Sequence, residues 1–108
     1  MMDFPTGETT TITRPGYRIE YIRPCGERGK LIAEGRIEIS MPLPAMKGAL
    51  EKKYRHVVAF PKMDMLKFDR GDHSILLYGN GDLVIRKIKN VGEALETAEN
   101  IVSLLKQS

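Results

Sequence analysis

The sequence predicts an α+β protein in which two helices cover one face of an antiparallel sheet. Two β-rich runs flank Asn80-Gly81, a dipeptide that tolerates positive φ angles and favours a tight β-hairpin with a type I′ turn. Directly after this hairpin, apolar residues recur at helical spacing from Val91 to Leu105, which indicates an amphipathic helix. A sheet with helices on one side is typical of the α+β class, and here an N-terminal β-hairpin extends it.

The chain length and composition predict one globular domain. The 108 residues include 42% hydrophobic and 29% charged side chains, and the formal net charge is +3. This charge permits an acidic partner, but positive and negative residues are mixed along the chain. Cys25 is the only cysteine, so the chain has no internal disulfide and no cysteine-based metal cage.

The first part of the chain predicts an arm followed by two strands. Residues 1–15 predict a flexible N-terminal arm with a short edge strand at Thr9–Thr13, and residues 16–108 predict the single domain. Tyr17–Ile22 alternates apolar and charged residues, which predicts a half-buried strand with Tyr17, Ile19 and Tyr21 on one face. A second strand is expected from Lys30 to Ser40, with Gly35 at a bulge or kink.

The middle of the chain predicts the first helix. Pro42 and Pro44 suit the first helical turn, and the helix is expected to end near Arg55. Its apolar stripe repeats every four residues, at Met46, Leu50 and Tyr54.

The last third predicts three strands and the second helix. The strands are expected at Met63–Phe68, Ser74–Tyr78 and Asp82–Ile88. Asn90 is a favourable N-cap, and Glu93 stands three residues later in a capping-box arrangement. The predicted order is therefore β-β-α-β-β-β-α.

Four short motifs in this last third match those of a known family. They are Leu76-Leu77-Tyr78 in one strand, Gly81-x-Leu83-Val84 in the next, Lys89 before the helix and Glu99-Asn100-Ile101 within it. Over residues 65–106 the chain resembles one half of a TATA-binding protein. Such proteins hold two tandem copies of a strand–helix–strands–helix unit and bend DNA over a saddle-shaped sheet, so the resemblance implies a half-saddle fold.

Two departures from that family change what is expected of the partner. The chain has one copy of the unit, so a complete saddle requires a homodimer. Asp82 stands where the family usually has a phosphate-facing lysine, and a carboxylate there repels a nucleic-acid backbone.

The resemblance, together with strand alternation, defines a candidate binding face on the open side of the sheet. Its members are Met65, Lys67, Leu76, Tyr78, Val84 and Arg86. The candidate phosphate contacts are Lys67, Asn80, Arg86 and Lys87. Ile75, Leu77, Leu83 and Ile85 are expected to face the helices. Leu76, Tyr78 and Val84 make the open side apolar, so we expect another macromolecule, a second subunit or the N-terminal hairpin to cover it.

Three functions remain open at this point. The leading hypothesis is a non-enzymatic binding protein that uses this face for a protein partner or for self-association as a homodimer. The alternative is a nucleic-acid-binding protein in which Tyr78 takes the place of an intercalating aromatic residue. The third is a small enzyme centred on Cys25, which has Arg23 and Arg28 nearby, or on His73.

No cofactor, metal site or catalytic residue is expected. Asp69, Asp72 and His73 cluster in sequence, but a turn around Gly71 favours aspartate for backbone reasons. His56 is expected to be a solvated residue at the helix end. The sequence shows no signal peptide and no apolar run long enough to cross a membrane, so we expect a cytoplasmic protein.

Overall fold

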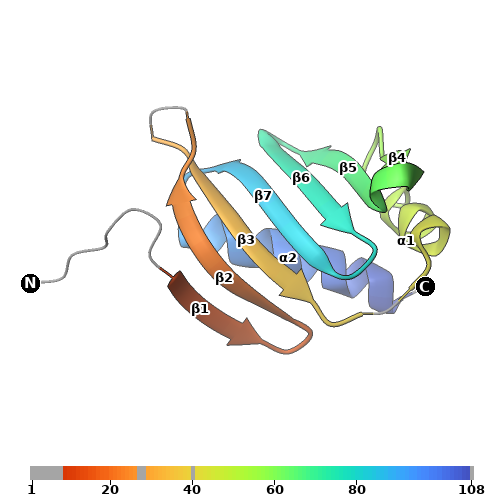
Figure 1. The fold of residues 1–108 in the computed structure, drawn as a ribbon, viewed down its shortest axis with the longest axis horizontal. Helices are drawn as coiled ribbons and strands as arrows, with labels where there is room; N and C mark the ends of the chain where they lie inside the picture. Colours follow the sequence, from red (N-terminus) through yellow and green to blue (C-terminus); the bar gives the residue numbers. More distant parts are fainter. Residues whose placement is uncertain (1–8, 27–28, 40, 108) are drawn as a thin grey trace, which may run out of the picture.

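The structure, a computed structural model, describes residues 9–26, 29–39 and 41–107 and confirms the α+β class. Seven antiparallel strands form one sheet, and two α-helices lie behind it (Figure 1). The strands are β1 (Thr9–Arg14), β2 (Tyr17–Pro24), β3 (Leu31–Ile37), β4 (Val58–Phe60), β5 (Met65–Arg70), β6 (His73–Tyr78) and β7 (Asp82–Ile88). The helices are α1 (Leu43–Leu50) and α2 (Val91–Lys106), with a short 3₁₀ turn, η1 (Pro61–Met63), between β4 and β5.

The strand order is β1-β2-β3-β7-β6-β5-β4, so two meanders meet at the β3–β7 pair. The long helix α2 packs across β2, β3 and β7, while α1 covers the β4–β5 side and contacts α2 (Figure 1). One apolar layer lies between sheet and helices. The predicted helix-facing residues Ile75, Leu77, Leu83 and Ile85 are all buried in it, together with Met46 and Leu50 of α1.

The N-terminal hairpin lies in the plane of the sheet. Residues 1–8 of the predicted arm lie outside the described residues, whereas Thr9–Arg14 form β1, antiparallel to β2. β2 in turn pairs with β3. The hairpin therefore lengthens the sheet, and the hypothesis that it covers the open face is wrong.

The predicted irregularity at Gly35 belongs to the neighbouring strand. The register between β2 and β3 shifts between Ile19 and Tyr21, which places the bulge in β2. A Cβ atom on Gly35 would lie 2.2 Å from the Arg18 carbonyl oxygen, so only glycine permits this close approach. The bulge also reverses the side chains after it. Tyr17 and Ile19 are buried as predicted, but Tyr21 points to the open face, which corrects its predicted orientation.

The first helix is shorter than its sequence pattern predicts. α1 ends at Leu50, and the chain then tightens through hydrogen bonds from Lys52 N–H to Ala49 O and from Lys53 N–H to Leu50 O. This turn brings Tyr54 into the core, where its ring packs against Phe68 at a centroid distance of 5.0 Å. After His56, whose φ is +59°, the chain forms β4, a three-residue strand that the sequence did not predict.

The β6–β7 turn differs from the predicted type I′ turn. Only Gly81 has a positive φ, of +101°, whereas Asn80 is not left-handed. The Gly81 N–H donates to the Tyr78 carbonyl over 3.0 Å, so Gly79-Asn80-Gly81 form a three-residue loop ending in a glycine bulge. The Asn80 side-chain oxygen accepts from the Asp82 N–H at 2.9 Å, which stabilises this alternative turn.

The start of α2 confirms the predicted cap. The Asn90 side-chain oxygen accepts a hydrogen bond from the Glu93 N–H at 3.0 Å. The Glu93 carboxylate in return accepts from the Lys89 N–H at 2.7 Å, one residue earlier than in a standard capping box. This backbone hydrogen bond is the main cause that lowers the pKa of Glu93, and His73 adds to it.

Candidate functional site: the open face of the sheet

Strand register places the six predicted binding residues on the side of the sheet opposite the helices. Met65 lies beside Tyr78, and Lys67 lies beside Leu76. Leu76 in turn lies beside Val84. Arg86 occupies the same side in the next row, opposite Ser74. Facing residues on paired antiparallel strands point to the same side, so the structure brings these residues onto one surface.

Three exposed apolar residues extend this surface, and the sequence prediction missed all three. Phe60 pairs with Met65 and is 38% exposed, and Val58 pairs with Lys67 and is 46% exposed. Tyr21 is 42% exposed and lies beside Glu34, in the same row as Val84. Val58 and Phe60 share this face because the middle residue of the strand, Ala59, packs against the core.

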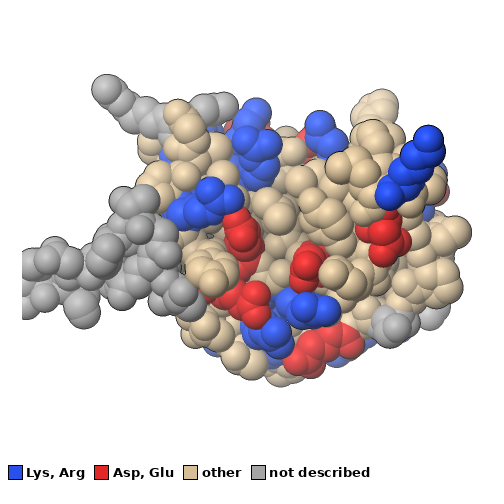
Figure 2. Space-filling model, in the orientation of Figure 1, with Lys and Arg blue, Asp and Glu red and all other residues tan. Residues whose placement is uncertain are grey.

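We call the resulting surface the apolar band. It consists of Tyr21, Val84, Leu76, Tyr78, Val58 and Phe60. The buried Met65 of β5 joins Tyr78 to Phe60, whereas Glu34 of β3 separates Tyr21 from Val84. Figure 2 shows this side of the molecule, where uncharged surface is broad over β6 and β7 and the charged side chains lie in small groups of both signs. The open face is therefore apolar at its centre and carries both positive and negative side chains around it.

The charges on β2 and β3 neutralise one another. Ion pairs join Arg18 to Glu20 and Arg23 to Glu34. Their side chains are about a third to a half exposed, so each pair contributes little to stability, roughly 0–1 kcal/mol. Their effect on recognition is larger, because they remove the uncompensated positive charge that a phosphate backbone requires.

Asp82 also forms an ion pair within the chain. Its carboxylate lies 3.3 Å from Arg36 Nη1, and Arg36 Nη2 donates to the Asn80 carbonyl at 3.1 Å. The Asn80 side chain is also held by Asp82. Asn80, a predicted phosphate contact, therefore has its polar groups engaged within the turn.

The remaining predicted phosphate contacts do not form a continuous stripe. Lys67 and Arg86 lie in different rows on β5 and β7, and neither forms an ion pair with a described carboxylate. Lys87 has a φ of +66° at a register shift in the β3–β7 pair, which leaves it exposed and turns Ile88 into the core. This bulge breaks the alternation that the sequence predicted for β7.

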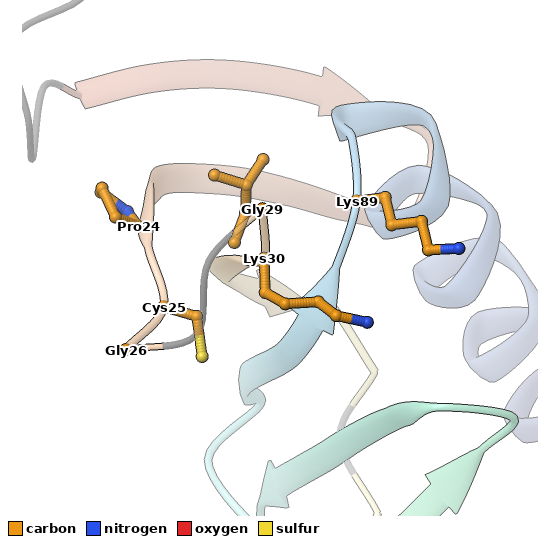
Figure 3. Close-up of a pocket in the computed structure, with 7 residues that line it drawn as sticks. Pro24, Cys25, Gly26, Gly29, Lys30 and Lys89 are labelled. Carbon is orange, nitrogen blue, oxygen red and sulfur yellow. The ribbon is translucent and has the colours of Figure 1, made fainter.

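Cys25 lines a separate pocket beside the loop after β2, with a volume of about 620 Å³. Lys30 and Lys89 also line the pocket, but Figure 3 shows the Lys89 side chain extending away from the thiol toward α2. His73 does not line this pocket, because its Nε2 atom lies 3.1 Å from a Glu93 carboxylate oxygen. The structure therefore provides no described histidine as a base for the thiol in this pocket.

The Asp69, Asp72 and His73 cluster separates in three dimensions. Asp69 shares the open side with Ser74, Asp72 lies in the β5–β6 turn, and His73 reaches toward α2. Within the part of the chain that the structure describes, no group of three or more His, Cys, Asp or Glu residues can hold a metal ion.

Comparisons with protein families, with curated proteins and with solved structures found no match to this chain. None of the helices among the described residues has the length and apolar character needed to cross a bilayer.

Proposed function

We propose that the protein is a non-enzymatic protein-interaction module whose open sheet face docks a second copy of the chain. The observation that carries this proposal is the apolar band, with Tyr21, Val58 and Phe60 each more than a third exposed on a single face. Monomeric proteins rarely leave contiguous apolar surface of this kind uncovered.

The energetics favour covering the band. Complete burial of a large apolar side chain contributes about 1.5–3 kcal/mol relative to exposure. Docking removes the water that remains on Phe60, Val58 and Tyr21 and on the half-buried Leu76, Tyr78 and Val84. In a twofold interface each of these residues is buried on both copies, so docking with a second copy buries twice the apolar area that one chain contributes.

The charge pattern favours a protein over a nucleic acid. Arg18, Arg23 and Arg36 are already paired with carboxylates of the same chain. The net charge of the chain is only +3, so two copies repel one another weakly. Two copies of this face can dock against each other, because each carries positive and negative side chains around an apolar centre.

The topology supports the half-saddle fold as part of this proposal. From β3 onwards the elements run β3-α1-β4-β5-β6-β7-α2, the strand–helix–strands–helix order of the TATA-binding-protein unit. In that family the open side of the sheet is the working surface, which agrees with the position of the apolar band. The β1–β2 hairpin is an addition to the unit.

Nucleic-acid binding is the second candidate for the same face. Lys67 and Arg86 favour it because no described carboxylate pairs with either of them, and Tyr78 supplies an aromatic ring on the same face, one row beyond Lys67. A ring that stacks on a base contributes about 1–3 kcal/mol.

Sedimentation equilibrium tests the primary proposal. We expect the protein to be a dimer of 12.2 kDa chains at micromolar concentration, and Phe60→Asp to be monomeric because it places a charge in the apolar band. Met63→Asp is the matched control, since Met63 is 60% exposed but lies in η1, outside the strands of the face. A monomeric wild type, or equal effects of both variants, would exclude the proposed dimer.

Fluorescence anisotropy with duplex DNA tests the second candidate. We expect weak binding at physiological salt. Submicromolar affinity that falls with a log–log salt slope near −0.9 per phosphate contact would favour nucleic acid instead. In that case Tyr78→Ala should weaken binding, and Asp82→Lys should strengthen it and steepen the slope.

A further inference from the structure

A second pocket lies on the helix side of the sheet, away from the apolar band. It has a volume of about 420 Å³ and forms where the segment after α1 meets the end of the β5–β6 hairpin. Its lining includes Lys53, Tyr54, Arg55 and His56 from the first segment and Arg70 from the second. The size falls in the range that proteins use for small molecules.

The pocket is strongly cationic. Neither Arg55 nor His56 forms an ion pair with a described carboxylate. Lys53 is held by the neutral side-chain amide of Asn100. Asp69 is the only acidic residue in the lining, and strand register directs its side chain to the open face with Ser74. The positive charge is thus poorly compensated within the pocket.

Arg70 is fixed in position by α2. Its Nη1 atom donates to Thr97 Oγ1 at 3.2 Å, and its Nη2 atom lies 3.3 Å from Glu96. Thr97 is completely buried, and its hydroxyl in turn donates to the Glu93 carbonyl at 2.8 Å. Glu96 is 65% exposed, so it neutralises Arg70 only weakly. The guanidinium is therefore preorganised and keeps most of its charge.

Tyr54 adds a buried donor that lacks an acceptor. The residue is 6% exposed, and its hydroxyl has almost no exposed surface and no acceptor among the described residues, although Arg70 lies close enough to donate to it. Arg70 is close enough to lower its pKa somewhat, but arginine only donates hydrogen bonds, so it cannot accept the hydroxyl proton. Burial is the larger effect and raises the pKa above 10.0, so the hydroxyl remains a donor at neutral pH. Because the hydroxyl itself has no exposed surface, the Arg70 guanidinium beside it is the group available to a ligand.

We propose that this pocket binds the phosphate group of a small phosphorylated molecule. Arginine guanidinium groups match phosphate oxygens in pairs, and both Arg55 and Arg70 line the pocket. The remaining volume accommodates the organic part of the ligand. This inference is independent of the function proposed for the open face.

Nuclear magnetic resonance titration of the ¹⁵N-labelled protein tests the proposal, with inorganic phosphate and ribose 5-phosphate as separate probes at constant ionic strength. Ribose 5-phosphate should produce saturable shifts at the amides of Arg55, His56 and Gly71, at a lower concentration than inorganic phosphate. Binding of inorganic phosphate alone would overturn the assignment to a small phosphorylated molecule. Shifts that do not saturate with either probe, or that spread evenly over the surface, would overturn the site itself.

Two variants and a matched control sharpen this test. Arg55→Gln should weaken ribose 5-phosphate binding about tenfold, because it removes a charge-assisted contact. Lys52→Gln makes the same change in net charge three residues earlier, outside the pocket lining, and should leave the affinity unchanged. Tyr54→Phe removes a hydroxyl that has no exposed surface, so it should leave binding unchanged while the protein stays folded. Equal losses for Lys52→Gln and Arg55→Gln would show a nonspecific charge effect and contradict the proposal.

Discussion

At the residue scale, two buried tyrosines illustrate how differently one side chain can be accommodated. Tyr17 is 2% exposed, and its hydroxyl donates to a Glu99 carboxylate oxygen of α2 at 2.9 Å. Tyr54 is nearly as buried but finds no acceptor among the described residues. The first hydroxyl ties the sheet to the helix, whereas the second is enclosed beside Arg70 without an acceptor.

Replacement of Tyr17 should change how the free energy of unfolding depends on pH. Burial and Glu99 raise the pKa of Tyr17 to about 12 from 10.0. The folded state therefore keeps its proton while the unfolded chain loses it, so this contribution to stability is present below pH 10.0 and is lost as the pH rises toward about 12. Tyr17→Phe should lower the free energy of unfolding by about 1 kcal/mol at neutral pH. Urea unfolding across the alkaline interval should then show a smaller decline for the variant, and parallel declines would contradict this account.

Tyr54→Phe should have the opposite effect on stability. The ring contact with Phe68 at 5.0 Å is retained, and a buried hydroxyl without an acceptor is removed. We expect the free energy of unfolding in phosphate-free buffer to rise by about 1 kcal/mol. A shift of the urea midpoint to lower concentration would show that the hydroxyl is satisfied in the folded protein.

At the element scale, the connections depend on contacts that no local pattern reveals. Gly81 is buried in the β6–β7 turn at a φ of +101°, and a Cβ atom there would lie 2.6 Å from the Ile37 carbonyl oxygen. Its own carbonyl accepts from the Ile37 N–H at 2.8 Å. The turn between β6 and β7 is thereby fastened to the end of β3.

A pair of glycine substitutions tests whether the contact between Gly81 and Ile37 stabilises the fold. Gly81→Ala should lower the free energy of unfolding by about 2–3 kcal/mol, because both the backbone angle and the close approach resist a side chain. Gly48→Ala in α1 is the control, since a Cβ atom there meets nothing within 4 Å. It should raise stability by about 0.5–1 kcal/mol through helix propensity. Chemical denaturation measures both, and equal effects would contradict the proposed role of Gly81.

The sequence predicted what is encoded locally and missed what is decided by packing. Period-two alternation correctly separated Leu76 and Val84 from Ile75 and Ile85, and the Asn90 cap followed from its own short motif. β4 was missed because three residues are too few for a periodic signal. Tyr21 was assigned to the wrong face because the β2 bulge depends on the approach of a different strand at Gly35. The cationic pocket likewise joins segments that are distant in sequence, although Lys52-Lys53-Tyr54-Arg55-His56 was a visible basic run.

At the scale of the whole molecule, the affinity of the proposed dimer and the affinity for nucleic acid should depend differently on salt concentration. The arginines of β2 and β3 are paired within their own chain, so docking through the apolar band releases few counterions. Burial of apolar surface, in contrast, is not weakened by salt.

We therefore expect the dissociation constant of the dimer to change less than about twofold between low and high sodium chloride concentration. Sedimentation equilibrium at several salt concentrations measures this directly. Dissociation of the dimer at high salt would show that charges across the interface, and not the apolar band, hold the two copies together.

The pairing of β3 with β7 also sets the order in which the protein can be assembled during synthesis. β3 emerges from the ribosome early, but its partner on one side is the last strand of the chain. Until that strand is translated, the inner edge of β3 has no backbone partner and the residues beneath it have no α2 to cover them. Such a nonlocal closing step slows folding relative to local hairpin formation. The nascent chain therefore carries an open sheet edge until β7 has been made, and such an edge is a site where the strands of other chains can pair.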